Sequence, residues 1–177
     1  KLSVEQRVSD LLGRMTLEEK VGQLNMKSLN RLKIDKKGKV TVGSLDSLFN
    51  GESIGCLESP FIEHEKIAVY SEAADQYLRT KTRLGIPAIQ IAECLHGTIF
   101  PQSIGLGSTW NPELIREMAG VIAEEALLAG VDQALSPLFD IARDPRYGRV
   151  EECYGEDPYL VKEMGVAFVK GLQGEPE

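Results

Sequence analysis

Short apolar runs alternate with well-capped helices in the second half of the chain, and this alternation constrains the fold more than any other feature. The run AIQIA at residues 88–92 has the composition of a short buried strand. A helix is predicted from the N-cap Asn111 and the following Pro112 to about Gly130. A second strand is predicted in QALSP at 133–137, and Asp157-Pro158 then begins a final helix that extends to about residue 172. This order of elements predicts parallel βα units.

The loops on the two sides of these strands differ in length and polarity. Loops that follow the strands, near 93–110 and 137–156, are long and polar, whereas those that lead into them are short. Binding groups gather at the carboxyl ends of strands in both α/β barrels and open sheets. The segment ARDPRYGRVEECYGEDPYL, residues 142–160, places three arginines and five acids around two glycines and two prolines. We interpret this charged segment as a loop that carries a binding site, with a solvated surface loop as the alternative.

The first half of the chain is predicted to be helix and loop. The stretch SVEQRVSDLLGRM places its apolar residues along one helical stripe. Thr16 with Glu19 three residues later forms a capping box, so a second helix is predicted within the first thirty residues. Residues 35–60 show little periodicity and are predicted to form a loop with a short strand at 39–42. A long amphipathic helix is predicted over 63–84.

Composition excludes several classes of function. A net charge of -7 argues against a nucleic-acid partner, because a phosphate backbone requires a basic face. No run approaches the roughly 18 apolar residues of a membrane span, so no membrane partner is expected. The three cysteines, Cys56, Cys94 and Cys153, are too few and too scattered for a disulfide framework or a zinc site. With no metal-ligand spacing and no phosphate loop, neither a metal nor a cofactor is expected.

Four stretches taken in order carry a more specific signal. They are RVSDLLGRMTLEEKVGQL (7–24), GIPAIQIAECLHG (85–97), FPQSIGLGSTWNPELI (100–115) and LSPLFDIARDPRYGRVEECYGEDPYLVKEMGVAFVKGLQG (135–174). Together they closely resemble the N-terminal domain of glycoside hydrolase family 3, which includes β-glucosidases, β-xylosidases and related exo-acting enzymes. The resemblance implies an α/β fold of the (β/α)8 TIM-barrel-like type. Because such a barrel needs roughly 250 residues, only its N-terminal part is expected within 1–177.

The same resemblance implies retaining hydrolysis of terminal, non-reducing β-D-glucosidic or β-D-xylosidic bonds. That mechanism uses a carboxylate nucleophile and a second acid about 5–5.5 Å apart. In this family the nucleophile is the aspartate of a Ser-Asp-Trp-like motif late in the barrel, whereas Ser9-Asp10 lies in an amphipathic helix. We therefore expect no catalytic residue in this chain, and we expect the nucleophile strand, a Lys-His pair and any α/β sandwich domain to lie downstream. The isolated chain is expected to be inactive, and its partners to be a β-linked oligosaccharide or glycoside and the remainder of the enzyme.

Three residues of the matching motifs are predicted to bind substrate. Glu93 directly follows the strand at 88–92, where its carboxylate can accept hydrogen bonds from two sugar hydroxyls, and the family has a sugar-binding acid here. Arg149 matches the family's sugar-contacting arginine and offers a planar fork of donors, with a salt bridge inside the loop as the alternative. His96 is a third candidate, for which a purely structural role is an equal alternative. Trp110 is expected to pack beside the Asn111 cap rather than to serve as a sugar platform.

Two other functions remain as alternatives. The β-N-acetylhexosaminidase branch of the same family depends on a downstream Lys-His motif. A non-catalytic carbohydrate-binding or assembly module would explain why the nucleophile motif is missing from the chain. Glucoside or xyloside preference, the compartment and the oligomeric state do not follow from the sequence.

Overall fold

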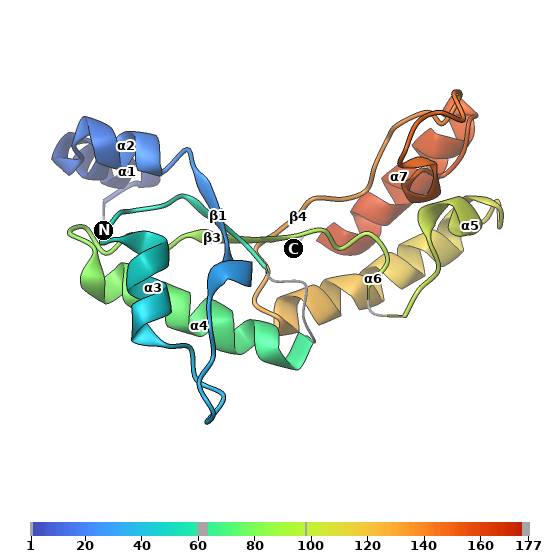
Figure 1. Ribbon diagram of the computed structural model, residues 1–177. Helices are drawn as coiled ribbons and strands as arrows, with labels where there is room; N and C mark the ends of the chain where they lie inside the picture. The colour runs from blue at the N-terminus through green and yellow to red at the C-terminus, as the bar shows by residue number, and fades with distance from the viewer. Residues whose placement is uncertain (1, 60–63, 98, 175–177) are drawn as a thin grey trace. The chain divides into compact units, whose positions relative to one another are not determined.

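The computed structural model describes residues 2–59, 64–97 and 99–174 (Figure 1). The chain divides into two compact units, Lys1–Ile91 and Ala92–Glu177, each with its own core. Its strands follow one another in chain order, β1-β2-β3-β4, as repeated βα units require. None of the helices in the described residues has the length and apolar character needed to cross a membrane.

The first unit begins with two short helices, and each has a complete capping box. Helix α1 (Val4–Arg14) is capped by Ser3, and α2 (Leu17–Gly22) is capped by Thr16, whose hydroxyl accepts from the N–H of Glu19 at 3.2 Å. The predicted capping box is therefore confirmed. The apolar stripe predicted for α1 lies on the exposed surface, because no residue of either helix is buried.

Three parallel strands form the sheet of the first unit. They are β1 (Met26–Ser28), β2 (Cys56–Glu58) and the longer β3 (Ile89–Ala92). The register aligns Met26 with Cys56 and Cys56 with Ile89. The 3-10 helix η1 (Leu29–Arg31) follows β1, and the helices that complete the unit are α3 (Val42–Phe49) and α4 (His64–Lys81).

The core of the first unit includes buried residues of η1, α3, β2 and α4. The rings of Phe49 and Tyr77 stack with centroids 5.2 Å apart and tie α3 to α4. Its buried members are Leu29, Leu32, Leu45, Leu48, Phe49, Ile54, Leu57, Tyr70, Ala74, Tyr77 and Leu78. Because Leu57 of β2 is fully buried in this cluster, the sheet packs on the helices through one of its faces.

The sequence-based prediction is wrong over much of residues 23–58. The second helix ends at Gly22 and a strand follows, α3 and β2 occupy the stretch predicted as loop, and no strand spans 39–42, where Val40 makes only an isolated bridge to Ile34. Strands of three residues are too short to show a period of two, so alternation could not reveal them. Helix α4 is close to its prediction, although the predicted first residue, Glu63, lies outside the described residues.

The second unit follows its prediction closely. Helix α6 (Pro112–Leu128) is capped by Asn111, whose side chain accepts from the N–H of Leu114 at 3.2 Å. Helix α7 (Pro158–Gln173) is capped by Asp157 in the same way, at 2.8 Å from the N–H of Leu160. The strand predicted at 133–137 is present as the shorter β4 (Gln133–Ala134). Helix α5 (Ser103–Gly107) and the 3-10 helix η2 (Val150–Glu152) were not predicted.

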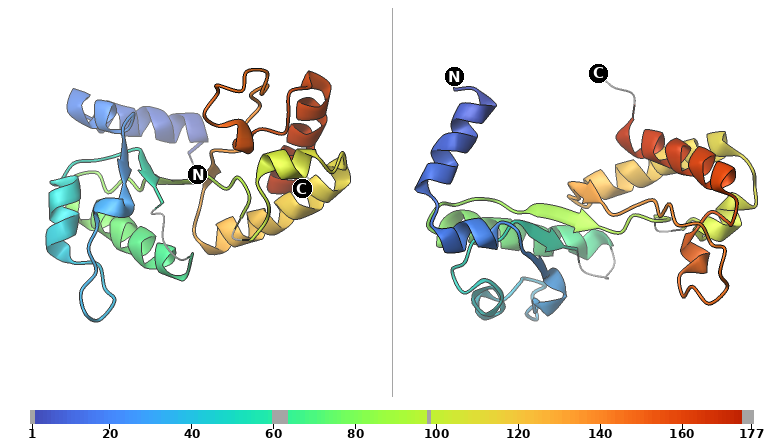
Figure 2. Two further views of the ribbon diagram at one scale, coloured as in Figure 1. Left: turned by 45° about the vertical axis from the view of Figure 1, so that its right-hand side comes forward. Right: turned by 90° about the horizontal axis from the view of Figure 1, so that it is seen from above.

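Helices α6 and α7 pack against each other and form most of the second core (Figure 2). An added Cβ at Gly171 of α7 would lie 2.4 Å from the carbonyl oxygen of Arg116 in α6, so the two backbones approach closely. The core residues are Leu106, Ile115, Met118, Ala119, Ile122, Tyr154, Leu160, Val161, Met164, Ala167 and Phe168. Trp110 is not among these core residues. It is 69% exposed, so the prediction that it packs beside the Asn111 cap is wrong.

Candidate functional site

The predicted site residues lie in the second unit, in the loops that follow β3 and β4. The N–H of Leu135, just past β4, donates to the carbonyl oxygen of Ala92 at the end of β3, at 2.8 Å. One residue later, the hydroxyl of Ser136 donates to the carbonyl oxygen of Cys94 at 3.3 Å. These bonds hold the beginnings of both loops side by side. The carboxyl ends of the two strands therefore present their loops together, as the alternation of strands and helices predicted.

The turn after β3 carries Glu93 and His96 and rests on helix α6. Gly97 has a φ of 57°, and an added Cβ there would lie 2.7 Å from a carboxylate oxygen of Glu125 and 3.0 Å from Ile122. Only a glycine fits so close to α6 with this backbone, so the turn is seated against the helix. Glu93 and His96 are both half-buried within it.

Cys94 lies between these residues but is unsuited to nucleophilic chemistry. Burial raises the pKa of its thiol, and the neighbouring Glu93 carboxylate raises that pKa further. A nucleophilic cysteine needs the opposite, an environment that stabilises the thiolate. The thiol therefore serves as a packing group beside the site.

Within the described part of the chain, His96 forms hydrogen bonds through its backbone and not through its side chain. Its carbonyl oxygen accepts from the N–H of Phe100 at 3.2 Å, which closes the turn. No hydrogen bond or ion pair of its imidazole is present among residues 2–59, 64–97 and 99–174. The substrate-binding role of His96 stays a prediction.

Within the described residues, the charged segment contains two local ion pairs. Asp144 accepts from the backbone N–H of Arg146 at 2.9 Å and from its guanidinium at 2.6 Å. The Arg146 side chain is the main cause of the lowered pKa of Asp144. The second pair joins Arg149 to Glu152, and no pair involving Arg143 is found in the described residues.

Arg149 binds Glu152 through a two-pronged contact. Its Nε donates to Oε1 at 2.7 Å and its Nη2 to Oε2 at 2.5 Å, while the arginine side chain keeps 51% of its exposure. A guanidinium has five N–H donors, so three remain for a ligand. The salt-bridge alternative considered for Arg149 is therefore real, but the salt bridge leaves the outer edge of the fork open.

Glu93 lies within electrostatic reach of Arg149. The pKa of Arg149 is raised chiefly by its hydrogen bonds and charge interaction with Glu152, and the charges of Tyr147 and Glu93 add to this effect. The two residues, 56 positions apart in the chain, thus act on each other electrostatically. Glu152 is the partner that orients the arginine, and the shared site of Glu93 and Arg149 stays a prediction.

The backbone around Arg149 is fixed by a buried anchor. Cys153 and Tyr154 are 0% and 1% exposed, and the thiol of Cys153 donates to the carbonyl oxygen of Arg149 at 3.4 Å. An added Cβ at Gly107 in α5 would lie 2.0 Å from the carbonyl oxygen of Tyr154. The close approach of α5 requires glycine there, and it holds η2 and Arg149 in place.

Two residues near this cluster were missed by reasoning from the sequence. Partial burial raises the pKa of the Tyr147 hydroxyl, and the Asp140 carboxylate raises it further. Asp140 also helps to raise the pKa of Cys153, after burial, so it lies near the same loop. Its position six residues after β4 was the available signal, since acids that follow parallel strands are candidates for a site.

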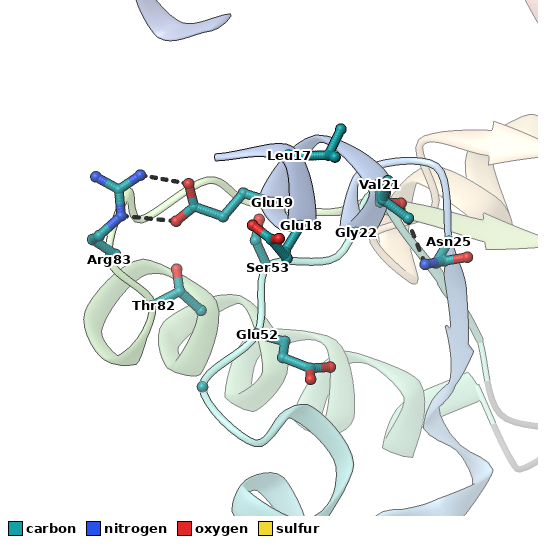
Figure 3. Close-up of a pocket in the computed structure, with 11 residues that line it drawn as sticks. Leu17, Glu18, Glu19, Val21, Gly22, Asn25, Glu52, Ser53, Thr82 and Arg83 are labelled. Atoms are coloured by element: carbon teal, nitrogen blue, oxygen red, sulfur yellow. Dashed lines mark hydrogen bonds and ion pairs between the residues drawn. The ribbon is translucent and has the colours of Figure 1, made fainter. Parts of the chain in front are cut away.

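A pocket in the first unit lies at the opposite end of the strands. It has a volume of about 540 Å³, and Figure 3 shows its lining side chains. Asn25 precedes β1, Ser53 precedes β2 and Arg83 precedes β3, so the pocket is at the amino ends of the strands. In α/β barrels that end serves stability rather than chemistry.

The Glu19–Arg83 ion pair beside this pocket supports a structural role. Arg83 donates to Glu19 through Nε at 2.9 Å and also through Nη2, and the two side chains face each other in Figure 3. Its Nη2 also donates to the carbonyl oxygen of Arg14 at 2.8 Å. These bonds join the end of α1 and helix α2 to the segment that follows α4, so we assign no substrate to the pocket. No group of three or more potential metal ligands occurs among the described residues.

Comparison with known proteins identifies the family. Residues 16–176 match the glycosyl hydrolase family 3 N-terminal domain. A β-xylosidase of Formosa agariphila is 46% identical over 138 residues, covering 71% of this chain and 18% of the xylosidase. A periplasmic β-glucosidase of Salmonella typhimurium is 34% identical over 172 residues, covering 95% of this chain and 21% of the glucosidase.

Solved structures agree with the sequence matches. A β-glucosidase from Listeria innocua, crystallised in complex with glucose, superposes with a TM-score of 0.76 at 34% identity, covering 98% of this chain and 24% of that protein. The chain thus spans 18% to 24% of the length of these relatives. The predicted fold class is confirmed: the chain is α/β with a parallel sheet, in keeping with part of a TIM-barrel-like domain. The chain belongs to glycosyl hydrolase family 3 and carries the sequence of that family's N-terminal domain.

Proposed function

We propose that this chain supplies the sugar-recognition part of a retaining glycoside hydrolase that releases terminal β-D-glucose or β-D-xylose from non-reducing ends. Family membership supports the reaction class, and the named relatives include both a β-xylosidase and a β-glucosidase. The observation that carries the proposal is the two-pronged Glu152 contact, which leaves three donors of Arg149 open in a loop whose start is hydrogen-bonded to the start of the Glu93 loop. A carboxylate beside a guanidinium with free donors suits a ligand rich in hydroxyl groups.

Each residue has a separate task in this proposal. Glu93 accepts hydrogen bonds from two neighbouring sugar hydroxyls, and Arg149 donates to a hydroxyl through the N–H groups that Glu152 leaves free. Glu152 is a positioning residue, because its two-pronged contact fixes the plane of the guanidinium. His96, in the same turn as Glu93, would complete the contacts to the sugar.

The nucleophile is assigned to a part of the enzyme beyond residues 1–177. A retaining mechanism requires a carboxylate that reaches the anomeric carbon, with a second acid about 5–5.5 Å away. In this proposal Glu93 binds hydroxyls and does not attack, and the barrel strands downstream bring the nucleophile to the sugar that Glu93 and Arg149 hold. The isolated chain then shows no hydrolysis of aryl β-glucosides or β-xylosides above buffer.

The test compares Glu93→Gln and Arg149→Lys in the enzyme that contains this segment together with its downstream strands. Contacts to sugar hydroxyls strengthen as the oxocarbenium-like transition state develops, so each change should lower kcat/KM by roughly 2–4 kcal/mol of transition-state stabilisation. Arg146→Lys is the matched control, because Arg146 bonds only to Asp144 within the described residues. It should leave kcat/KM near the wild-type value.

Three results would count against the proposal. Near-wild-type kcat/KM for Glu93→Gln would remove the sugar-binding role of the carboxylate. Turnover by the purified 177-residue chain, lost on a single substitution within it, would place the chemistry inside this segment. Sugar binding without hydrolysis by the longer protein would favour a non-catalytic module.

A further inference from the structure

The loop between β1 and α3 has a charge opposite to that of the whole chain. Residues 31–41, which we call the lysine hairpin, contain one acid, Asp35, and five bases: Arg31, Lys33, Lys36, Lys37 and Lys39. The chain as a whole has 27 acidic and 20 basic residues and a net charge of -7. The hairpin is therefore a local basic feature on an acidic protein.

The hairpin is ordered by its own hydrogen bonds. The N–H of Thr41 donates to the carbonyl oxygen of Lys33, and the N–H of Asp35 to that of Lys39, both at 2.8 Å. One carboxylate oxygen of Asp35 accepts the N–H groups of Lys37 at 2.8 Å and of Lys39 at 3.0 Å. The one acid of the hairpin is thus engaged in forming the turn, and the basic side chains project from a preorganised backbone.

The five basic side chains are exposed, although the charge of Lys39 acts on Asp35. None of them forms an ion pair with any acid in the described residues. Other bases of the same unit do form such pairs: Lys27 with Glu52, and Arg83 with Glu19. Figures 1 and 2 show the hairpin, in blue between η1 and α3, projecting beyond α3 and away from the strands of the first unit.

The hairpin is part of the connection that leaves the carboxyl end of β1. It follows β1 directly, through η1, so it belongs to the loops at the carboxyl ends of the parallel strands. In α/β barrels these loops form the face that meets substrate. The pocket at the amino ends of the strands is at the other end of the same unit.

We propose that the lysine hairpin binds the anionic groups, carboxylate or sulfate, of a polysaccharide. Lysine ammonium groups are point charges on flexible stems, which suit anions repeated at intervals along a polymer. The hairpin has no aromatic side chain on which a nucleic-acid base could stack, and its tip, Lys36-Lys37-Gly38, has no apolar side chain to enter a bilayer. The choice of a glycan among anionic polymers rests on the proposed function.

The experiment measures binding by the 177-residue chain, which requires no hydrolysis. Fluorescently labelled polygalacturonate and dextran sulfate are titrated with the protein at about 10 mM salt, where charges act over about 30 Å. Neutral dextran, phosphatidylserine vesicles and duplex DNA are compared at equal charge or mass. The hairpin variant carries Lys36→Gln, Lys37→Gln and Lys39→Gln. The matched control removes three exposed lysines elsewhere, with Lys20→Gln, Lys81→Gln and Lys170→Gln.

Wild type and control should bind at least one of the two anionic glycans, and the hairpin variant should bind it at least about tenfold more weakly. Preference for polygalacturonate assigns the site to carboxylates, and preference for dextran sulfate assigns it to sulfates. Unchanged affinity of the hairpin variant, no binding to either anionic glycan, or tighter binding of vesicles or DNA would overturn the proposal. Binding that persists although aryl glycosides are not hydrolysed by the longer enzyme would reject the proposed reaction and leave the hairpin's affinity for acidic polymers standing.

Discussion

The charged segment at 142–160 and the lysine hairpin at 31–41 are both polar loops after a parallel strand, yet they treat their charges in opposite ways. In the charged segment, Arg146 and Arg149 are each bound to a carboxylate, and the chain is anchored by two buried residues. In the hairpin the bases form no ion pair within the described residues, and backbone hydrogen bonds together with the Asp35 carboxylate close the turn. The first arrangement fixes one guanidinium in one orientation, and the second offers several mobile charges.

The difference separates two kinds of recognition. A neutral sugar is held by short, directed hydrogen bonds, so its donors must be oriented before it arrives, and the Glu152 contact does this for Arg149. An anionic polymer is attracted over a longer range by charge, so uncompensated bases suffice. The density of charged residues in the sequence does not distinguish these two kinds of recognition, because both loops are rich in charged residues.

The largest effect is expected from breaking the anchor of the charged segment. Gly107→Ala adds a Cβ that would lie only 2.0 Å from the carbonyl oxygen of Tyr154. Because that oxygen belongs to the backbone, it cannot move aside without shifting the loop. Overpacking of this kind should lower the free energy of unfolding by about 3 kcal/mol. Chemical denaturation of the chain measures it. Gly148→Ala is the control, since an added Cβ at Gly148 meets no atom within 4 Å.

The same variant tests whether the two loops are independent. Gly107→Ala should lower sugar recognition through Arg149 and leave the binding of anionic polymers by the hairpin unchanged, because the hairpin belongs to the first unit. Equal stability of Gly107→Ala and Gly148→Ala would show that α5 does not hold the segment. A parallel loss of anionic-polymer binding would show that the two loops are coupled.

A smaller effect is expected from acid and salt on Asp35 and Asp144. Backbone N–H groups of Lys39 and Lys37 lower the pKa of Asp35, whereas the Arg146 side chain is the main cause for Asp144. Since both pKa values are depressed, each contribution to stability is present above about 3.9, the ordinary value for Asp, and is lost as the pH falls through the folded pKa. Acid should therefore loosen both turns only below about pH 4.

Salt should then distinguish the two carboxylates. Ion pairs of exposed groups are screened, so high salt should raise the pKa of Asp144 toward its ordinary value and change that of Asp35 less. NMR titration of the carboxyl carbons at low and high salt gives both values. Asp35→Asn assigns the hairpin signal and should weaken binding of anionic polymers. Equal salt sensitivity of the two pKa values would contradict the assigned causes.

The sequence predicted the second unit far better than the first, for physical reasons. Asn111 and Asp157 are strong N-caps followed by proline, so the first residues of α6 and α7 can be predicted from the local sequence. Glu93 and Arg149 could be predicted to lie at one end of the sheet because the order of elements in the sequence predicted parallel βα units. By contrast, β1 and β2 have three residues each, and their existence depends on the pairing of β1 with β2 and of β2 with β3. No local pattern contains that information.

Within the site, the identity of the arginine's partner could not be predicted. Glu151, Glu152 and Glu156 are all near Arg149 in the sequence. Helix η2 decides among them, because a 3-10 turn brings residues three apart to the same side and so places Glu152 beside Arg149. Asp140 and Tyr147 were missed because their proximity arises from the path of the loop and not from spacing.

The smallest effect is expected where the anchor of the charged segment contains a polar atom. The hydroxyl of Tyr154 is buried without a hydrogen-bond partner among the described residues, and burial raises its pKa. If the ring alone anchors the loop, Tyr154→Phe removes an unsatisfied group and keeps the packing, so the free energy of unfolding should stay equal or rise by up to about 1 kcal/mol. Tyr154→Leu, which keeps an apolar side chain but loses ring volume, should lower it instead. Denaturant melts of the two variants measure both changes. If Tyr154→Phe lowered the free energy of unfolding by more than about 1 kcal/mol, the hydroxyl would be hydrogen-bonded in solution. The charged segment would then depend on a polar contact for its closure, as the hairpin does.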